Sequence, residues 1–218
     1  LGHAGFMAVG AYASAALTQI KGKECLVFLS FLGNAAPLGL FIVALLFGGT
    51  LAAVAGLAVG LPSLRLKGDY LAIVTLGFGE IIRVLIQNTE AIGGARGLAG
   101  IPPHTSLGWT WGISLLSIYC VGSLVNSTYG KGFVAVRDDE IAAEAMGVNT
   151  TRYKVTAFVV GAFFAGLAGA LYAHFIGYVT PEGFSFLKSV DVVVMVILGG
   201  MGSTAGVTVA ALGLTFLN

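Results

Sequence analysis

Charged residues are scarce in this sequence. Asp, Glu, Lys and Arg make up 10% of its 218 residues, whereas hydrophobic residues make up 57% and the mean hydropathy is +0.94. Soluble domains carry roughly 25% charged residues, so this chain lacks the polar side chains that a water-exposed surface requires. Because the apolar residues come in several long runs, the fold class is predicted to be all-α, a polytopic bundle of transmembrane helices.

The charges that are present nearly cancel, and cysteine is almost absent. With a net charge of +1 and no tract in which aromatic residues alternate with Lys or Arg, nothing indicates nucleic-acid binding. Cys25 and Cys120 share no metal-binding spacing and lie in or beside apolar runs, so we expect two inert thiols and no metal site. The Gly-rich segment 93–103 lacks the Gly-Lys-Ser/Thr ending of a phosphate-binding loop, so neither ATP binding nor a cofactor is predicted for this chain.

Five apolar runs approach or exceed the length that a membrane-crossing helix needs. Gly5 and Gly10 lie in the first run and predict a bend or a break there, and Pro62 is expected to end the second. In the second and fifth runs small residues recur every four positions, which predicts close helix packing. These residues are Gly48, Ala52, Gly56 and Gly60, then Gly161, Ala165, Gly169 and Ala173. The five predicted helices are residues 3–20, 38–61, 70–86, 112–128 and 155–178.

A sixth apolar run, residues 190–217, is interrupted at Gly199, Gly200, Gly202 and Ser203. Each half is too short to cross a membrane, which predicts a broken or re-entrant element. The backbone groups freed at such a break need protein or a water-filled cavity around them. We therefore expect the break to lie beside a polar path through the membrane.

The third run carries Glu80 and Arg83, whose spacing of three residues lets them pair on one helix face. The pair is interpreted either as a gate or polar step in such a path, or as a structural pair whose Arg83 reaches the lipid headgroups. Gly77 and Gly79 are expected to loosen this helix and to open its backbone. Thr75, Gly77 and Glu80 are therefore assigned to the path as well.

One long polar passage, residues 130–154, interrupts the apolar sequence. Asp138 and Asp139 are placed to cap a helix, Glu140 favours its first turn, and Gly147 is placed to end it after roughly two turns. Apolar side chains on this short helix are expected to form a knob that projects from a charged loop and fits a groove in a partner. The residues of this apolar knob are Ile141, Ala142, Ala145 and Met146.

The sequence of this passage, Asp138-Asp139-Glu140 followed by Ala142-Ala143 and Gly147, resembles the EAA loop through which permease subunits of ABC importers engage their ATPases. Ile141 stands where that loop usually has Glu, and Glu140 lies one position earlier. This variation, together with five further blocks, is similar to the branched-chain amino-acid permease family. The blocks are LGHAGF (1–6), LRLKGDYLAIVTLGFGEIIR (64–83), GGARGLAGIP (93–102), GLAGALYAHF (166–175) and VILGGMGS (196–203).

The resemblance implies a single transmembrane permease domain over residues 1–218, a fragment of a longer chain, with residues 130–154 as a cytoplasmic ATPase-coupling loop. It implies two ATPase subunits, a second homologous permease subunit that completes a heterodimer, and an extracytoplasmic substrate-binding protein, assembled at the inner (plasma) membrane. The amino-acid substrate would be leucine, isoleucine or valine, and the subunit would be a transporter component and not an enzyme. The residues expected to couple to the ATPase are Arg137, Asp138, Asp139, Glu140, Ile141, Ala142, Ala143, Met146 and Gly147.

Lys and Arg residues predict the orientation of the chain. If the first five predicted helices alternate in direction, more basic residues lie on the side of residues 130–154 than on the other, and that side is predicted to be cytoplasmic. The first group is Arg65, Lys67, Lys131, Arg137, Arg152 and Lys154, and the second is Lys21, Lys23, Arg96 and Lys188.

Three alternatives remain beside this interpretation. A urea or short-amide permease of the same superfamily is one, although residues 68–77 look closer to the amino-acid branch. An intramembrane enzyme is disfavoured because His3, Glu80 and His174 are too scattered in sequence to nominate one site. A passive channel would not need the apolar knob. A hydrogen-bonded structural role is favoured for His174 over a pore-lining one, and His104 is expected to be an exposed loop residue.

Overall fold

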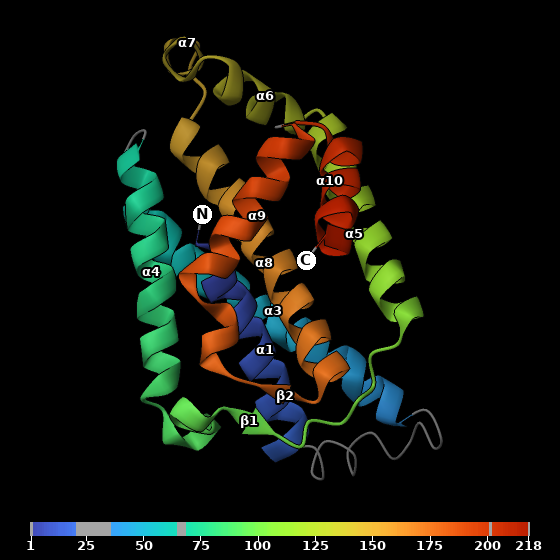
Figure 1. Cartoon of the computed structure of the whole chain (residues 1–218). Helices are drawn as coiled ribbons and strands as arrows, with labels where there is room; N and C mark the ends of the chain where they lie inside the picture. The colour runs from blue at the N-terminus through green and yellow to red at the C-terminus, as the bar shows by residue number, and fades with distance from the viewer. Residues whose placement is uncertain (1, 21–35, 65–68, 201, 218) are drawn as a thin grey trace.

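The computed structural model describes residues 2–20, 36–64, 69–200 and 202–217. Nearly all of these residues are helical, and the helices form one bundle (Figure 1). The helices are α1 (His3–Ile20), α3 (Ala36–Ser63), α4 (Asp69–Gln87), α5 (Leu107–Asn126), α6 (Gly130–Asp138), α7 (Glu140–Ala145), α8 (Thr150–Ile176), α9 (Phe186–Gly199) and α10 (Thr204–Leu217). The connections contain the 3₁₀ helices η2 (Glu90–Ile92), η3 (Gly94–Arg96) and η4 (Pro181–Phe184), and the strands β1 (Leu98–Ala99) and β2 (Tyr178–Val179).

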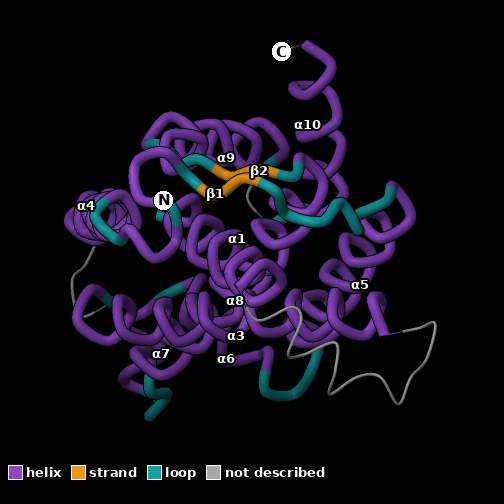
Figure 2. Tube along the Cα trace, turned by 90° about the horizontal axis from the view of Figure 1, so that it is seen from below, coloured by secondary structure: helices purple, strands orange, loops and turns teal. Residues whose placement is uncertain are grey.

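Four of the described helices are long and apolar enough to cross a membrane, namely α3, α4 from Tyr70 onward, α5 and α8. The predicted all-α class with several membrane-crossing helices is confirmed. The helix α1, also predicted to span, is not one of the four and lies in the interior of the bundle beside α8 and α3 (Figure 2). A helix enclosed by protein needs no continuous apolar surface, so α1 accommodates Ser14 and Thr18, whose buried hydroxyls donate to backbone carbonyls one turn earlier.

The predicted bend or break at Gly5 and Gly10 is wrong, because α1 is a continuous helix. Both glycines instead let neighbouring backbones come close. A Cβ atom at Gly5 would lie 2.8 Å from the Cα of Gly79 in α4, and one at Gly10 would collide with the backbone of Gly166 in α8. The same packing explains why Gly79 does not loosen α4, which is continuous from Asp69 to Gln87.

The helix α8 packs against both α1 and α3. The predicted small-residue stripe of α8 faces α1, since a Cβ atom at Gly169 would collide with the carbonyl of Met7. A second small-residue face of α8, which the sequence analysis missed, faces the predicted stripe of α3. A Cβ atom at Gly56 would lie 2.5 Å from the Cβ of Ala162. This second face consists of Ala162, Gly166 and Ala170.

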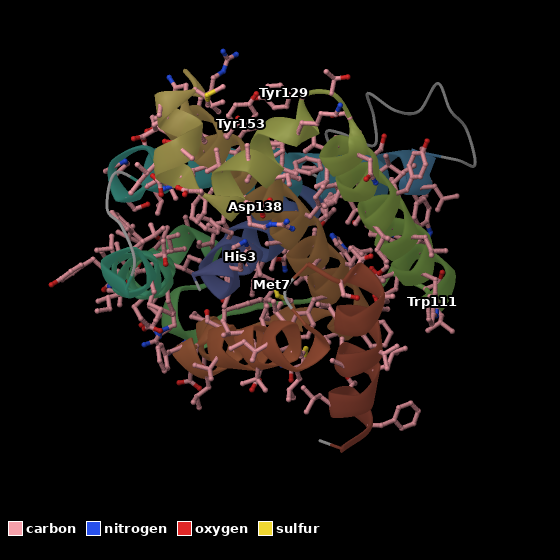
Figure 3. All side chains as sticks on the ribbon, turned by 90° about the horizontal axis from the view of Figure 1, so that it is seen from above. His3, Met7, Trp111, Tyr129, Asp138 and Tyr153 are labelled. Atoms are coloured by element: carbon pink, nitrogen blue, oxygen red, sulfur yellow. The ribbon has the colours of Figure 1, made fainter. Side chains whose placement is uncertain are left out.

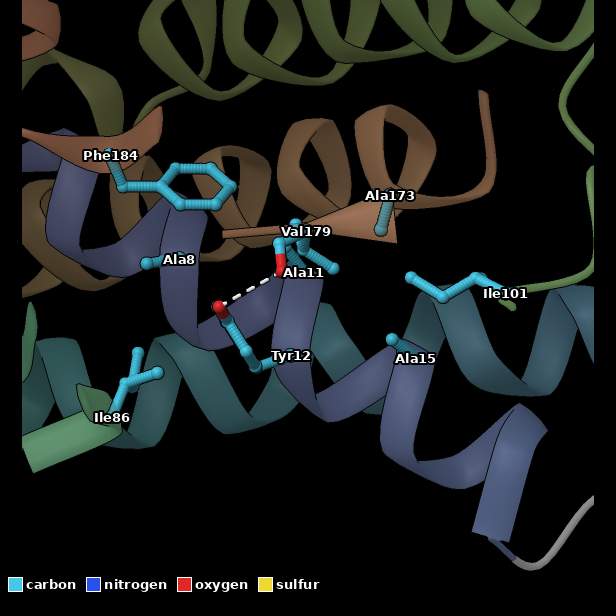
Figure 4. Packing of buried hydrophobic residues seen from close by; sticks show 9 residues of the cluster. All are labelled: Ala8, Ala11, Tyr12, Ala15, Ile86, Ile101, Ala173, Val179 and Phe184. Carbon is cyan, nitrogen blue, oxygen red and sulfur yellow. Dashed lines mark hydrogen bonds between the residues drawn. The ribbon is translucent and has the colours of Figure 1, made fainter. Parts of the chain in front are cut away.

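The connections gather at two opposite ends of the bundle (Figure 1). The end that carries α6 and α7 is called the α7 end. At the other, the strand end, β1 and β2 pair antiparallel with Leu98 opposite Val179 and Ala99 opposite Tyr178. The carbonyl of Val179 also accepts a hydrogen bond of 3.2 Å from the hydroxyl of Tyr12, inside an apolar cluster (Figure 4). The strand end is thereby fastened to α1.

Basic residues in the described part of the chain favour the α7 end. Lys131, Arg137, Arg152 and Lys154 belong to the elements at this end, whereas Arg96 and Lys188 belong to elements at the strand end and Arg83 lies in α4 near its strand-end terminus. The other residues in the orientation count, Arg65, Lys67, Lys21 and Lys23, lie outside the described residues, as does Cys25. Cys120 is exposed on α5.

Three helix boundaries differ from the predicted ones by two to five residues. The helix α3 passes through Pro62 to Ser63, whose hydroxyl donates to the carbonyl of Val59 at 2.7 Å. A proline in the last turn therefore does not end this helix. Both α5 and α8 begin five residues earlier than predicted, at Leu107 and Thr150. The early start of α8 follows from Asn149, whose side chain accepts a hydrogen bond from the backbone N–H of Arg152 and caps the helix.

The break in the last apolar run is confirmed. It separates α9 from α10, helices of 14 residues each, and Gly200 and Gly202 there have φ angles of 84° and 99°. Only glycine adopts such angles readily. The two short helices pack against each other, with the backbone of Gly206 directly against that of Gly199.

Packing between α8 and α1 predicts a sharp difference between two glycine substitutions. Gly169→Ala places a Cβ atom against the carbonyl of Met7, so it should lower the free energy of unfolding by about 1–3 kcal/mol. Gly112→Ala on α5, where no atom lies within 4 Å of the added Cβ, should cause no loss. Thermal unfolding in detergent measures both. Equal midpoints for the two variants would contradict the α1–α8 contact.

Candidate functional site

The polar passage 130–154 contains two helices, of which only the second was predicted. The unpredicted helix is α6. The ring of Tyr129, the residue before α6, packs against rings of both helices: its centroid lies 5.6 Å from that of Phe133 in α6 and 4.8 Å from that of Tyr153 in α8 (Figure 3). The four-residue spacing of Tyr129 and Phe133 was the available signal for this helix. The ring cluster fastens α6 to the first turns of α8.

The predicted start and end of α7 are confirmed. Asp139 caps the helix, since its Oδ1 accepts hydrogen bonds from the backbone N–H groups of Ile141 at 2.9 Å and Ala142 at 3.0 Å. Asp138, expected to share this role, is instead the last residue of α6 and pairs with Arg137 at 2.8 Å. Gly147 ends α7 with a φ of 83°.

The outer surface of α7 is apolar and open. Ile141 is 75% exposed and Met146 is 84% exposed, and Ala142 and Ala145 beside them are exposed as well. Ala143 faces inward and is buried. The α7 helix stands at the extreme end of the bundle, where no other described element covers it (Figure 1). The apolar knob has the predicted form.

The acidic side chains of α7 point the other way. Glu140 Oε1 lies 2.6 Å from Lys154 Nζ, and Glu144 accepts a hydrogen bond of 2.6 Å from the hydroxyl of Thr150. Lys154 and Thr150 both belong to the first turns of α8. The two carboxylates therefore hold α7 against α8, and the apolar side chains of α7 face away from α8.

A groove of about 730 Å³ runs between α5, α6, α8 and the break that separates α9 from α10. Arg137 of the coupling passage and Gly202 and Ser203 of the break line this groove together, with Asn126 and mostly apolar side chains from α5. The structure thus brings together residues that the sequence analysis assigned to two different sites. Within the same break, Gly200 faces open space and Gly199 packs on α10.

The residues of α4 that were predicted to line the substrate path do not line this groove. The helices α4 and α5 flank α1 and α8 on opposite sides, so Thr75, Gly77 and Glu80 do not share the groove with Ser203 (Figures 1 and 2). Thr75 is buried and its hydroxyl donates to the carbonyl of Ala72 at 3.0 Å. The expected opening of the α4 backbone at Gly77 is not found, although this position faces open space. Their role in a substrate path stays a prediction.

Glu80 and Arg83 pair as predicted. Their Oε2 and Nε atoms are 2.8 Å apart, and the side chains are 37% and 26% exposed. Sequence analysis passed over another carboxylate in an apolar helix, Asp191 on α9, which is exposed. A single acid within an otherwise apolar run was the signal that could have found it.

His174 is fully buried and its Nδ1 lies 3.0 Å from the carbonyl oxygen of Pro102, which confirms a hydrogen-bonded residue. The expectation for His104 is wrong: it is partly buried, with its ring 6.0 Å from Phe41 and 6.5 Å from His174. Residues 101–105 fold onto the end of α8, and Thr105 donates to the carbonyl of Leu171. No three His, Cys, Asp or Glu side chains come together among the residues that the structure describes.

Taken together, the membrane-length helices, the short broken pair and the exposed α7 define a polytopic α-helical membrane protein. Across residues 1–218 the sequence matches the family described as the branched-chain amino acid transport system permease component, and the chain belongs to that family.

Curated relatives agree with this assignment. The chain is 38% identical to the high-affinity branched-chain amino acid transport system permease proteins LivM of Salmonella typhimurium and of Escherichia coli, over 97% of its own length and 54% of theirs. It is 29% identical to LivH of Escherichia coli, a permease protein of the same transport system, over 47% of this chain and 33% of LivH. The chain thus spans about half the length of the LivM proteins. No solved structure matches it.

The pairing of Glu80 with Arg83 predicts coupling between their substitutions. Glu80→Gln or Arg83→Gln alone leaves one charge without its partner, so the free energies of unfolding of the two single variants and the double variant should not add. We expect a coupling of at least about 0.5 kcal/mol in denaturation measured in detergent.

The same variants separate a structural pair from a gate. A structural pair predicts that the double variant recovers transport with its stability, whereas a gate predicts a stable double variant that transports poorly or leaks. We expect the former, because Arg83 lies near the end of α4 and a gate belongs nearer the middle of a span. Simple additivity of the two losses would refute the pair itself.

Proposed function

We propose that this chain is the permease subunit of an ATP-driven importer that carries leucine, isoleucine and valine across the inner (plasma) membrane. Support from sequence is the identity of 38% to two permease proteins of branched-chain amino acid transport systems. Support from geometry is the exposed apolar surface of α7 at one end of a membrane bundle. An apolar surface of this kind, presented beyond the lipid by a short capped helix, suits a groove in a protein partner.

In this proposal the α7 end faces the cytoplasm, where two ATPase subunits bind residues 130–154 and supply the energy of ATP hydrolysis. The excess of basic residues at the α7 end supports this orientation. Ile141 and Met146 enter the ATPase groove, and Asp139 and Gly147 hold α7 in the required shape. The permease itself carries out passage, and no chemical step is assigned to it.

The opposite, strand end faces the extracytoplasmic space and receives amino acid from a substrate-binding protein. A second, homologous permease subunit completes a heterodimer, a role for which LivH is the model among the relatives. The groove between α5 and the break after α9 is the candidate for part of the path, because Arg137, Asn126 and Ser203 there offer polar groups to a zwitterion among apolar walls.

Transport by the full-length permease with its partners in sealed vesicles tests this proposal. Labelled leucine, isoleucine, valine and urea are offered to the binding-protein side, with ATP present or absent on the other. We expect uptake of the three amino acids that requires ATP. Uptake of urea in their place would establish the alternative substrate class, and uptake that ignores ATP would identify a channel.

The exposed knob predicts a specific loss of coupling. Ile141→Asp and Met146→Asp each place a charge on a surface that is open in the subunit alone, so the variants should reach the membrane at parental levels. Buried in the ATPase groove, that charge should lower ATP-dependent transport by about tenfold or more. Thr128→Asp, an exposed change in the turn before α6 and outside residues 130–154, is the matched control and should transport normally. Copurification of parental amounts of ATPase with both knob variants, with normal stimulation of ATP hydrolysis, would refute the role of the knob.

A further inference from the structure

We infer that Glu140 and Lys154 are positioning residues which join α7 to α8, so that a displacement of α7 by the ATPase moves α8. This inference rests on the proposed function. The carboxylate oxygen and the ammonium nitrogen are 2.6 Å apart, and the two side chains are 27% and 22% exposed. Ion pairs in such partly shielded positions interact more strongly than freely exposed ones.

A second bond runs parallel to the first. Thr150 donates to Glu144 at 2.6 Å. Glu140 and Glu144 are four residues apart on α7, and Thr150 and Lys154 are four residues apart on α8, so each pair shares one helix face. Two helix faces are therefore joined at two points one turn apart, which fixes the direction of α7 and not only its distance from α8.

Glu140 of α7 makes its contact within the subunit, with α8, and not with a partner protein. Glu140 faces α8, while Ile141 faces outward and is 75% exposed. The partner therefore contacts the apolar side chains, and the carboxylate anchors them.

These two bonds are the side-chain hydrogen bonds and ion pairs that join α7 to α8 among the described residues. The covalent link is the short segment 146–149, which includes Gly147 with a φ of 83°. A helix of six residues is too short to be stable by itself. When the ATPase displaces α7, the side-chain contacts with α8 therefore determine whether α8 and the rest of the bundle move as well.

The helix α8 is suited to receive this motion. It has 27 residues and no proline, so it is a continuous rod of roughly 40 Å. Beyond its first turns it packs between α1 and α3. At the strand end it holds residues 101–105 through the bond of His174 to Pro102 and of Thr105 to Leu171, both at 3.0 Å. A shift of α8 therefore reaches the far end of the bundle.

The test compares how many amino-acid molecules the assembled transporter carries per ATP hydrolysed. Glu140→Gln and Lys154→Gln should each lower this ratio about threefold, the factor by which a partly exposed ion pair biases two arrangements. The exchanged pair, Glu140→Lys with Lys154→Glu, should recover most of the ratio. Lys188→Gln removes an exposed positive charge from the first turn of α9, outside residues 130–154, and leaves the pair intact, so it should keep the parental ratio.

Outcomes of this test distinguish the inference from simpler roles. If the single variants lower only the amount of assembled transporter while the ratio stays parental, the pair is merely structural and the inference is wrong. It is also wrong if the exchanged pair does no better than the single variants. Lys154→Gln leaves the sequence of α7 unchanged and so carries the test if Glu140→Gln fails to assemble. Absence of ATP-dependent transport in the parent would refute the proposed function itself, and the inference with it.

Discussion

Close contact of α8 with α1 and α3 is the interaction on which the rest of the structure depends. Lipid tails are as apolar as the helices, so helices in a bilayer gain little from hydrophobic burial and associate through backbone proximity and van der Waals contact. Glycine and alanine permit this proximity: Gly169 meets the backbone of Met7 on one side of α8, and Gly166 meets that of Gly48 and Gly49 on another. Larger side chains at these positions would separate all three helices.

The elements at both ends of the bundle are bound to α1 or α8, so the contact between these helices fixes where those elements lie. At the strand end, Tyr12 of α1 and His174 of α8 bind backbone carbonyls of the connections, so the strand pair is held by both α1 and α8. At the α7 end, α6 and α7 are fastened to the first turns of α8 by the aromatic cluster and by the ion pair of Glu140 with Lys154. The helix α5, by contrast, has no buried residues and leaves its apolar surface to lipid or to a partner.

Sequence analysis was most successful where a local rule decides the outcome. Gly200 and Gly202 separate α9 from α10 because glycine alone readily adopts their φ angles, and Asp139 caps α7 because its carboxylate reaches two free N–H groups nearby. It failed where a distant contact overrides the local rule. Gly5 and Gly10 suggest a broken helix from the sequence, but in the structure they allow α4 and α8 to pack closely against a continuous α1. His104 was expected to be exposed, but residues 101–105 fold onto α8 and partly bury it.

The same distinction between local rules and distant contacts applies to the candidate site. Composition, capping signals and helix periodicity by themselves determined the membrane class and the apolar knob, because they act within one segment. The family followed from the resemblance of several sequence blocks to a known family. Only the tertiary structure decided which residues meet: Arg137 lies in one groove with Ser203, Thr75 and Glu80 lie on the other side of the core, and Glu140 turns inward to Lys154. These contacts join segments far apart in the chain or separated by a turn, and their geometry follows from how α8 packs between α1 and α3, which no local pattern encodes.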